Sequence, residues 1–309
     1  MPQETAFMAD PQPPLAVSLG LLLVLATLWG ASYTFIKIAV ETIPPITLIA
    51  TRTLIAGSLI LVVLHLRGLR LPLDRRNLGR FFVQACLNSV VPFVLVAWGT
   101  QFVDAGLATI LNSLTPVFAF LINWGITRHE VVSTRKALGV AAGLVGICLV
   151  VGPSALQGAS QQLTAQLAII IAAMAYGAAV TFGRTFRDLD PMMPAAGSLL
   201  MGSVILMPVS LIVDRPWTLA PTASSLSALV ALSVFSTALA FTLYFYLLKR
   251  IGTVGVTAQA YLRVPIGVGI GMVFLGELPQ PTAWMGMALV VVSVIAMTLP
   301  SRKSRTATV

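Results

Sequence analysis

The side chains of this 309-residue chain that could bind a solute are polar and aromatic residues inside long apolar runs. Arg52 and Arg263 are the only charges well inside those runs. An arginine at the centre of a bilayer costs about 2.5 to 3.5 kcal/mol, which carbonyls, water or an anion must offset. Arg52 is near enough to a helix end to extend toward the outer interface, whereas Arg263 lies near the middle of its run. Arg263 is therefore the candidate partner for an anionic group of a substrate.

Amide and aromatic side chains at similar depth are the other candidates for contacts with a solute. Gln84, Asn88 and Trp98 follow helical spacing and would share one face of their helix. Buried amides also bridge neighbouring helices, and a tryptophan near a helix end also fits an interfacial aromatic belt, so both alternatives stay open. With Arg263, the predicted substrate-binding residues are Trp29, Tyr33, Asn88, Trp98, Asn112, Tyr176, Tyr244 and Gln259.

Two prolines inside apolar runs are the candidate hinges. Pro116 removes the helical hydrogen bond to the carbonyl of Asn112, and Pro265 removes the one to the carbonyl of Tyr261. Irregular backbone at membrane depth is tolerated where it lines a cavity, so kinks at these two positions predict a binding site or a hinge.

The composition places these residues in a membrane. The chain is 57% hydrophobic and 9% charged, with a mean hydropathy of +0.94, which leaves too little polar surface for a soluble globule of this size. The apolar runs are long and continuous, which favours helices of about 20 residues over the short alternating strands of a barrel. The first run is too long for the apolar region of a secretory signal and is expected to remain as a helix.

Ten apolar runs predict ten transmembrane helices. They lie at about 15–37, 45–66, 80–101, 105–127, 134–152, 164–186, 192–213, 227–249, 253–276 and 282–300. If the N-terminus is cytoplasmic, only Lys37 and Arg215 of the 19 lysines and arginines fall in outer loops, and Arg52 and Arg263 fall within spans. This bias predicts a multi-pass protein of a bacterial inner membrane with both termini in the cytoplasm. It also explains the net charge of +9 without a nucleic-acid partner.

The sequence repeats itself once. The stretch "LWGASYTFIK" at 28–37 returns 147 residues later as "AYGAAVTFGR" at 175–184. At the same offset, Asn112 corresponds to Gln259 and Glu130 to Glu277. The predicted organisation is a cytoplasmic tail (1–14), two five-helix repeats (15–152 and 164–300) and a basic cytoplasmic tail (301–309).

An odd number of helices in each repeat makes the two copies inverted in the membrane. The predicted fold class is therefore an all-α integral membrane protein with ten transmembrane helices arranged as two inverted five-helix repeats. Such repeats are typical of secondary transporters that give alternating access to a central site, because the two halves can exchange conformations.

These features resemble the drug/metabolite transporter superfamily, specifically its ten-helix EamA-type exporters. The matching stretches are "WGASYTFIK", the Arg52-x-x-x-Ala56 pair, "LTPVFAFLINWGITRHE" and "RVPIGVGIGMVFLGE", and together they cover most of the chain. The resemblance implies export of small metabolites, often amino acids, through a cavity lined by the first, third, fourth, sixth, eighth and ninth helices. One departure is that Leu199 and Val180 occupy the repeat positions of Arg52 and Tyr33, so the site is not expected to be symmetric.

The predicted function is a secondary transporter that exports small metabolites, with hydrophobic or aromatic amino acids as the favoured substrates. The alternatives are a proton-coupled efflux carrier for drugs or other metabolites, a channel, and a membrane-embedded enzyme. An enzyme is disfavoured because the histidines, His65 and His129, fall at helix ends and no nucleotide-binding or zinc-binding spacing occurs. The expected partners are a small-molecule substrate and the lipid bilayer, without a cofactor, a metal or nucleic acid.

The acidic residues predict how transport is driven. All of them lie in tails, loops or near helix ends, so no carboxylate is placed deep enough to carry a coupled proton. Glu130 and Glu277 are expected to tie helix ends to nearby loops. Transport is therefore expected to be facilitated rather than ion-coupled.

Overall fold

In a computed structural model, the described residues are 15–125, 134–156, 160–257 and 259–298, and in these ranges the chain forms helices and no strand. The short segments η2 (Gly183–Phe186) and η3 (Pro216–Thr218) are 3-10 helices. The longer elements are α1 (Leu15–Ala39), α2 (Pro45–Leu66), α3 (Arg75–Ala85), η1 (Cys86–Val90), α4 (Val91–Gly99), α5 (Ala105–Asn112), α6 (Thr115–Gly125), α7 (Thr134–Leu156), α8 (Gln161–Phe182), α9 (Met192–Val213), α10 (Ala223–Ser233), η4 (Val234–Leu239), α11 (Ala240–Thr257), α12 (Gln259–Leu275) and α13 (Pro281–Thr298).

These elements correspond in order to the ten predicted spans. Among the described residues, eight helices are long and apolar enough to cross a membrane, and the apolar parts of α12 and α13 are shorter. The third span combines α3, η1 and α4, the fourth combines α5 and α6, and the eighth combines α10, η4 and α11. The prediction of an all-α membrane protein is confirmed.

The third and eighth spans begin earlier than hydropathy predicts because polar residues cap them. The carboxylate of Asp74 accepts a hydrogen bond from the backbone N–H of Asn77 (3.1 Å), so α3 begins at Arg75. The hydroxyl of Thr222 accepts from the backbone N–H of Ser225 (3.2 Å), so α10 begins at Ala223. Capping satisfies the backbone N–H groups that a helix end leaves unpaired. A hydropathy profile misses these starts because the capping residues are polar.

The predicted hinges differ from each other. The fourth span breaks between α5 and α6 next to Pro116, and the hydroxyl of Thr115 donates to the freed carbonyl of Asn112 (2.8 Å). In the second repeat, α12 remains helical through Pro265, and the backbone instead leaves helical geometry at Gly252, with φ of 70°. Glycine takes this positive φ without the Cβ clash that other residues meet.

Irregular backbone also recurs in the third and eighth spans. The π-helical segments η1 and η4 occupy overlapping positions of the two repeats, because residues 86–90 shifted by 147 become 233–237. Within η4, the hydroxyl of Thr237 donates to the carbonyl of Leu232, five residues earlier (2.7 Å). Such π segments are frequent at functional sites, because they change which side chains a helix turns toward its neighbours.

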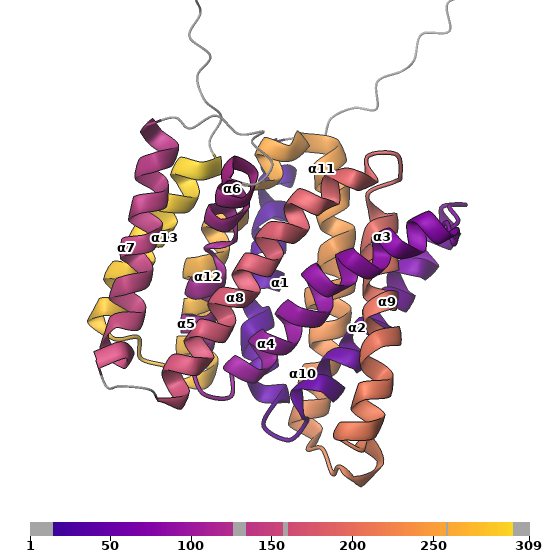
Figure 1. The fold of residues 1–309 in the computed structure, drawn as a ribbon, viewed down its shortest axis with the longest axis horizontal. Helices are drawn as coiled ribbons and strands as arrows, with labels where there is room; N and C mark the ends of the chain where they lie inside the picture. Colours follow the sequence, from indigo (N-terminus) through magenta and orange to yellow (C-terminus); the bar gives the residue numbers. More distant parts are fainter. Residues whose placement is uncertain (1–14, 126–133, 157–159, 258, 299–309) are drawn as a thin grey trace, which may run out of the picture.

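The packing of the helices follows the repeat. In Figure 1, α7 and α13 lie side by side at the left of the bundle, and α2 packs against α9 near its right side. The contact of α1 with α12 has its counterpart in the contact of α8 with α5 and α6.

The glycines of the repeated motif lie at these two crossings. A Cβ on Gly30 would lie 3.1 Å from the backbone nitrogen of Gly267, and one on Gly177 would lie 2.7 Å from that of Ala119. The motif therefore recurs because each copy needs a helix that approaches its neighbour backbone to backbone.

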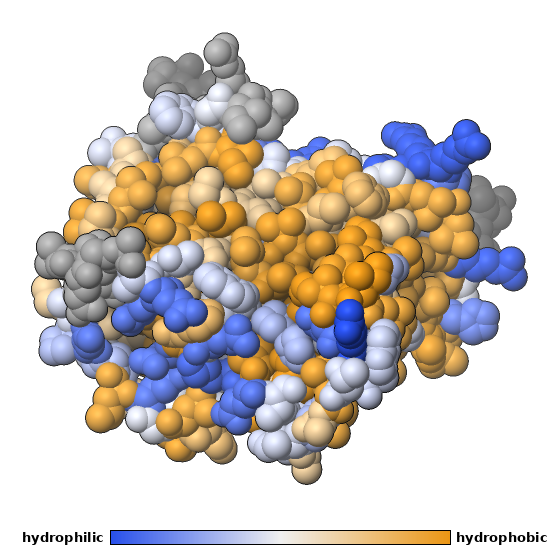
Figure 2. All heavy atoms as spheres, turned by 60° about the horizontal axis from the view of Figure 1, so that its bottom comes forward, coloured by the Kyte–Doolittle hydropathy of each residue, from blue (hydrophilic) through white to orange (hydrophobic). Residues whose placement is uncertain are grey.

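The outer surface of the bundle suits lipid. Figure 2 shows a broad orange band of hydrophobic residues across one face, with hydrophilic residues gathered below it and at its upper right edge. On several spans, large apolar side chains have more than half of their surface exposed. So many exposed apolar side chains are not found on a soluble globular protein. They include Val62, Ile171, Val204, Ile212, Val273, Phe274 and Met285.

Candidate substrate-binding site

A cavity of about 620 Å³ lies inside the bundle, lined by residues from both repeats. Its described lining comes from the first, second, third, fourth, sixth, eighth and ninth spans, and none of it from α7, α9 or α13. The sequence-predicted residues on its wall are Trp29, Tyr33, Asn88, Asn112, Pro116, Tyr176, Tyr244, Gln259 and Arg263. The remaining lining residues are Ser32, Arg52, Phe93, Thr115, Ala119, Phe120, Asn123, Val180, Arg184, Ser236, Phe241 and Ala260.

Trp98 and Pro265 are the predicted residues that do not line the cavity. The ring of Trp98 packs against Phe102 at the end of α4, with centroids 5.3 Å apart. Asn88 lies in η1, and a π turn holds about one residue more than an α turn, so the face that continues from Asn88 passes through Phe93 rather than Trp98. Pro265 is exposed on α12.

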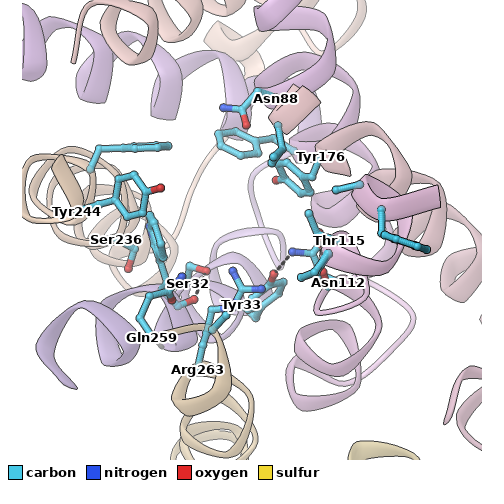
Figure 3. A pocket seen from close by; sticks show the side chains of 18 of the residues that line it. Ser32, Tyr33, Asn88, Asn112, Thr115, Tyr176, Ser236, Tyr244, Gln259 and Arg263 are labelled. Atoms are coloured by element: carbon cyan, nitrogen blue, oxygen red, sulfur yellow. Dashed lines mark hydrogen bonds between the residues drawn. The ribbon is translucent and has the colours of Figure 1, made fainter. Parts of the chain in front are cut away.

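Polar side chains from α1, α5 and α12 gather on one wall of the cavity (Figure 3). Ser32, Tyr33, Gln259 and Arg263 lie close together in this view, and the Nδ2 amide of Asn112 donates to the hydroxyl of Tyr33. Three buried atoms on this wall have no hydrogen-bond partner among the described residues: Asn112 Oδ1, Gln259 Oε1 and Arg263 Nε. Buried polar groups in folded proteins are nearly always paired, so these atoms are available to a bound solute or to water.

Arg52 is the main functional candidate that the sequence did not assign to the site. It is buried, with 6% of its surface exposed, and does not extend to the outer interface. Its Nε donates to the Thr237 hydroxyl in η4 (2.9 Å), and its guanidinium lies 3.9 Å from the centroid of the Phe93 ring. The sequence signals for it were its charge inside an apolar run and the Arg52-x-x-x-Ala56 pair. The cavity therefore has two deep guanidinium groups instead of the single one expected from Arg263.

Two groups of aromatic rings form another part of the wall. Trp29 packs against Phe241 and Tyr244, with centroids 5.9 and 5.5 Å away. Phe93 packs against Tyr176, with centroids 6.2 Å apart. Trp29 and Tyr176 precede the two motif glycines, so the repeat presents one ring from each half to the cavity.

The described lining contains arginines and no aspartate or glutamate. Two acidic residues between η2 and α9 pair with basic residues outside the lining. Asp188 accepts two hydrogen bonds from Arg80 (2.6 and 3.0 Å), which hold the pKa of its carboxyl below the usual range. Asp190 accepts from Lys249 (2.8 Å). The described wall is therefore electropositive and complements an anionic group.

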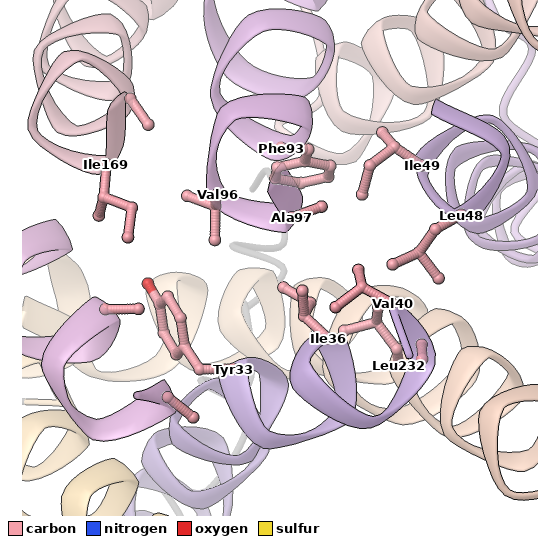
Figure 4. Close-up of a cluster of buried hydrophobic side chains, with 14 of the residues drawn as sticks. Tyr33, Ile36, Val40, Leu48, Ile49, Phe93, Val96, Ala97, Ile169 and Leu232 are labelled. Atoms are coloured by element: carbon pink, nitrogen blue, oxygen red, sulfur yellow. The ribbon is translucent and has the colours of Figure 1, made fainter. Parts of the chain in front are cut away.

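The cavity is closed at the end where α1 finishes and α2 begins. Apolar side chains of the buried core lie there, among them Ile36, Leu48, Val96, Ile169 and Leu232, and Figure 4 draws them as members of one cluster. At the other end, where α1 begins and α8 finishes, the lining reaches the exposed residues Val180 and Arg184. The cavity therefore opens toward the end of the bundle where α1 begins.

Two polar contacts reinforce the closed side. The ammonium of Lys37 donates to the carbonyl of Val103 (2.8 Å). The carboxylate of Glu277 accepts from the backbone N–H groups of Ala105 (2.6 Å) and Gly106 (2.9 Å), and so caps α5. The expected role of Glu277 at a helix end is confirmed, while its repeat partner Glu130 lies outside the described residues.

The fold and the site together define a class of protein. A multi-pass helical bundle, built from two repeats around a polar cavity with interrupted helices, is the architecture of a membrane transporter. The chain belongs to the EamA-like transporter family, part of the drug/metabolite transporter superfamily, and matches it twice, over residues 17–152 and 163–299. The double match agrees with the internal duplication.

Relatives support the same class. The inner membrane transporter YedA of Escherichia coli (strain K12) is 28% identical over 91% of this chain and 90% of its own length. The transporter YoaV of Bacillus subtilis (strain 168) is 25% identical over 81% and 85%. A probable terminal-alkyne amino-acid exporter of Streptantibioticus cattleyicolor is 24% identical over 86% and 88%. A protein of known crystal structure, 17% identical, aligns with a TM-score of 0.65 over 92% of this chain and 96% of its own, which shows a shared fold.

Proposed function

We propose that this protein exports small metabolites, and that its substrates are amino acids with hydrophobic or aromatic side chains. The observation that carries this proposal is the composition of the cavity wall. Arg263, whose Nε has no partner among the described residues, faces a chamber walled by aromatic rings. A guanidinium pairs well with a carboxylate, and aromatic rings favour an apolar body.

The size of the cavity and a relative support the same substrate class. A volume of about 620 Å³ is within the usual range for small-molecule sites and leaves room for a large amino acid. The relative from Streptantibioticus cattleyicolor is described as a probable amino-acid exporter. The cationic wall disfavours the positively charged drugs that a multidrug carrier would bind.

Alternating access is supported by the asymmetry of the cavity. It is open at the end where α1 begins and closed by apolar side chains at the end where α1 finishes. With both termini in the cytoplasm, this conformation would receive substrate from the cytoplasm. Exchange of conformations between the two repeats would then open the opposite side.

Facilitated transport is supported by the lack of a titratable acid on the described wall. A proton-coupled carrier would need such a group to bind a proton in one conformation and release it in the other. The substrate gradient would then drive export.

Counterflow in proteoliposomes tests the proposal. Purified protein is placed in vesicles preloaded with unlabelled phenylalanine or leucine, and entry of the labelled amino acid is followed. A nucleoside and tetraphenylphosphonium serve as comparison substrates. Saturable exchange of the amino acids is expected. Exchange of tetraphenylphosphonium driven by a pH gradient, without exchange of any amino acid, would favour the proton-coupled drug carrier instead.

A further inference from the structure

We propose that Asn112 and Gln259 form the site for the substrate's α-ammonium group, next to the carboxylate site at Arg263. This inference rests on the proposed function, because it assigns the two charged groups of an amino acid to separate parts of one wall. It predicts that the protein requires a free amino group as well as a free carboxylate.

The first step is that both amides offer an unused acceptor. Asn112 is 5% exposed and Gln259 is 8% exposed, and both line the cavity. The hydrogen bond from Asn112 Nδ2 to the Tyr33 hydroxyl leaves Oδ1 as the free end of that amide. Gln259 Oε1 is likewise without a partner among the described residues. A buried carbonyl oxygen without a donor costs about 1 to 3 kcal/mol, so a donor that enters the cavity gains by binding there.

The second step is the nature of that donor. An ammonium carries three donors and no acceptor, and it matches carbonyl oxygens better than a neutral hydroxyl does. Carboxylates would be its usual partners, but the described wall has none, so amide oxygens are the strongest acceptors present. Ser236 adds a third buried oxygen without a partner among the described residues on the same cavity.

The third step is the spacing of the two charge sites. Gln259 and Arg263 are four residues apart on α12 and therefore lie on one face of the helix, with Cβ atoms about 5 to 6 Å apart. An amino acid carries its ammonium and carboxylate on a single carbon, so neighbouring side chains of this kind can bind both groups at once. Figure 3 shows both residues across the cavity from Tyr176, which leaves the Tyr176 side for the substrate's side chain.

The repeat explains why only one orientation is favoured. Asn112 and Gln259 are repeat partners, so the pseudo-two-fold axis supplies an amide acceptor from each half. Arg263 has Pro116 at its repeat position, so the guanidinium occurs on one side only. The carboxylate is thereby fixed at α12, while the ammonium can contact both halves.

Competition in the counterflow assay tests this inference. Labelled phenylalanine exchange is inhibited with phenylalanine or with 3-phenylpropionate, which lacks the amino group. In the unmodified protein, we expect phenylalanine to compete at least about tenfold better, as loss of one charge-assisted hydrogen bond predicts. In Gln259→Met, and separately in Asn112→Leu, this preference should fall by about tenfold, while inhibition by 3-phenylpropionate stays unchanged. The preference is a ratio within one preparation and does not depend on the amount of folded protein.

Gln84→Met is the matched control. Gln84 Oε1 is also buried without a partner among the described residues, but Gln84 does not line the cavity. Its replacement should leave the preference intact, and an equal fall in this variant would overturn the inference. Equal competition by phenylalanine and 3-phenylpropionate in the unmodified protein would also overturn it, while leaving amino-acid transport standing. If no amino acid exchanges at all, the proposed function and this inference both fail.

Discussion

Replacing Glu277 should lower the thermal stability of the protein, because Glu277 ties two spans together at the closed side of the bundle. This carboxylate joins the end of the ninth span to the start of the fourth, through hydrogen bonds of 2.6 and 2.9 Å to the N–H groups of Ala105 and Gly106. Asp104, at the N-cap position of α5, makes no side-chain capping bond. Glu277 therefore supplies from a distant part of the chain the cap and the negative charge that a helix N-terminus favours.

The size of the effect follows from these two bonds. Substitution of a capping residue by alanine costs about 0.5 to 2 kcal/mol, and a hydrogen bond to a charged group contributes about 1.5 to 3 kcal/mol. Because Glu277 is partly exposed, the lower parts of these ranges apply, which is about 1 to 2 kcal/mol for each of the two hydrogen bonds. Glu277→Ala should therefore lower the free energy of unfolding by about 2 to 4 kcal/mol. At about 2 °C per kcal/mol for a chain of this size, Tm should fall by about 4 to 8 °C. Glu277→Gln keeps one acceptor and should show about half this shift.

Thermal unfolding of the detergent-purified protein, followed by the loss of the monodisperse peak after heating, measures this shift. Glu41→Ala is the control, because Glu41 is an exposed carboxylate in the loop after α1, on the same side. Gly271→Ala should reproduce the loss, since its new Cβ would collide with the Glu277 carboxylate. Equal Tm values for Glu277→Ala and Glu41→Ala would show that the cap does not stabilise the fold.

Three further outcomes are expected. A cysteine at Ser160 should react with an impermeant reagent added from outside the cell, and one at Asp74 should not; the reverse pattern would refute cytoplasmic termini. Arg263→Ala should reduce amino-acid exchange by about ten- to a hundredfold with little change in Tm. Arg263→Lys should keep only part of the exchange, because an ammonium lacks the planar fork of donors. A fall in Tm in parallel with the loss of exchange would indicate a structural arginine. Exchange should run equally with and without a pH gradient and survive a protonophore, and uphill uptake after an imposed pH step would exclude facilitated transport.

The sequence alone determined the spans, their repetition and the depth of the polar residues. Long apolar runs have one stable form in a bilayer, so their positions predict helices directly. The 147-residue repeat that relates Asn112 to Gln259 can be seen in the sequence, and both residues line the same cavity. Depth also singled out Arg263, because a charge in the middle of a run must have a partner in protein, water or solute.

Only the tertiary structure decided which way the side chains face and which residues meet. Helical spacing put Trp98 on the face of Asn88, but the π segment η1 shifts that face by about one residue, and Phe93 lines the cavity instead. No local sequence signal in η1 predicts this π-helical turn. Distance from a helix end likewise allowed Arg52 to reach the interface, whereas contacts with Thr237 and Phe93 hold it inside. Hydropathy fixes where a residue lies along the membrane normal, but its direction around the helix axis depends on backbone irregularities and on neighbours that are distant in the sequence.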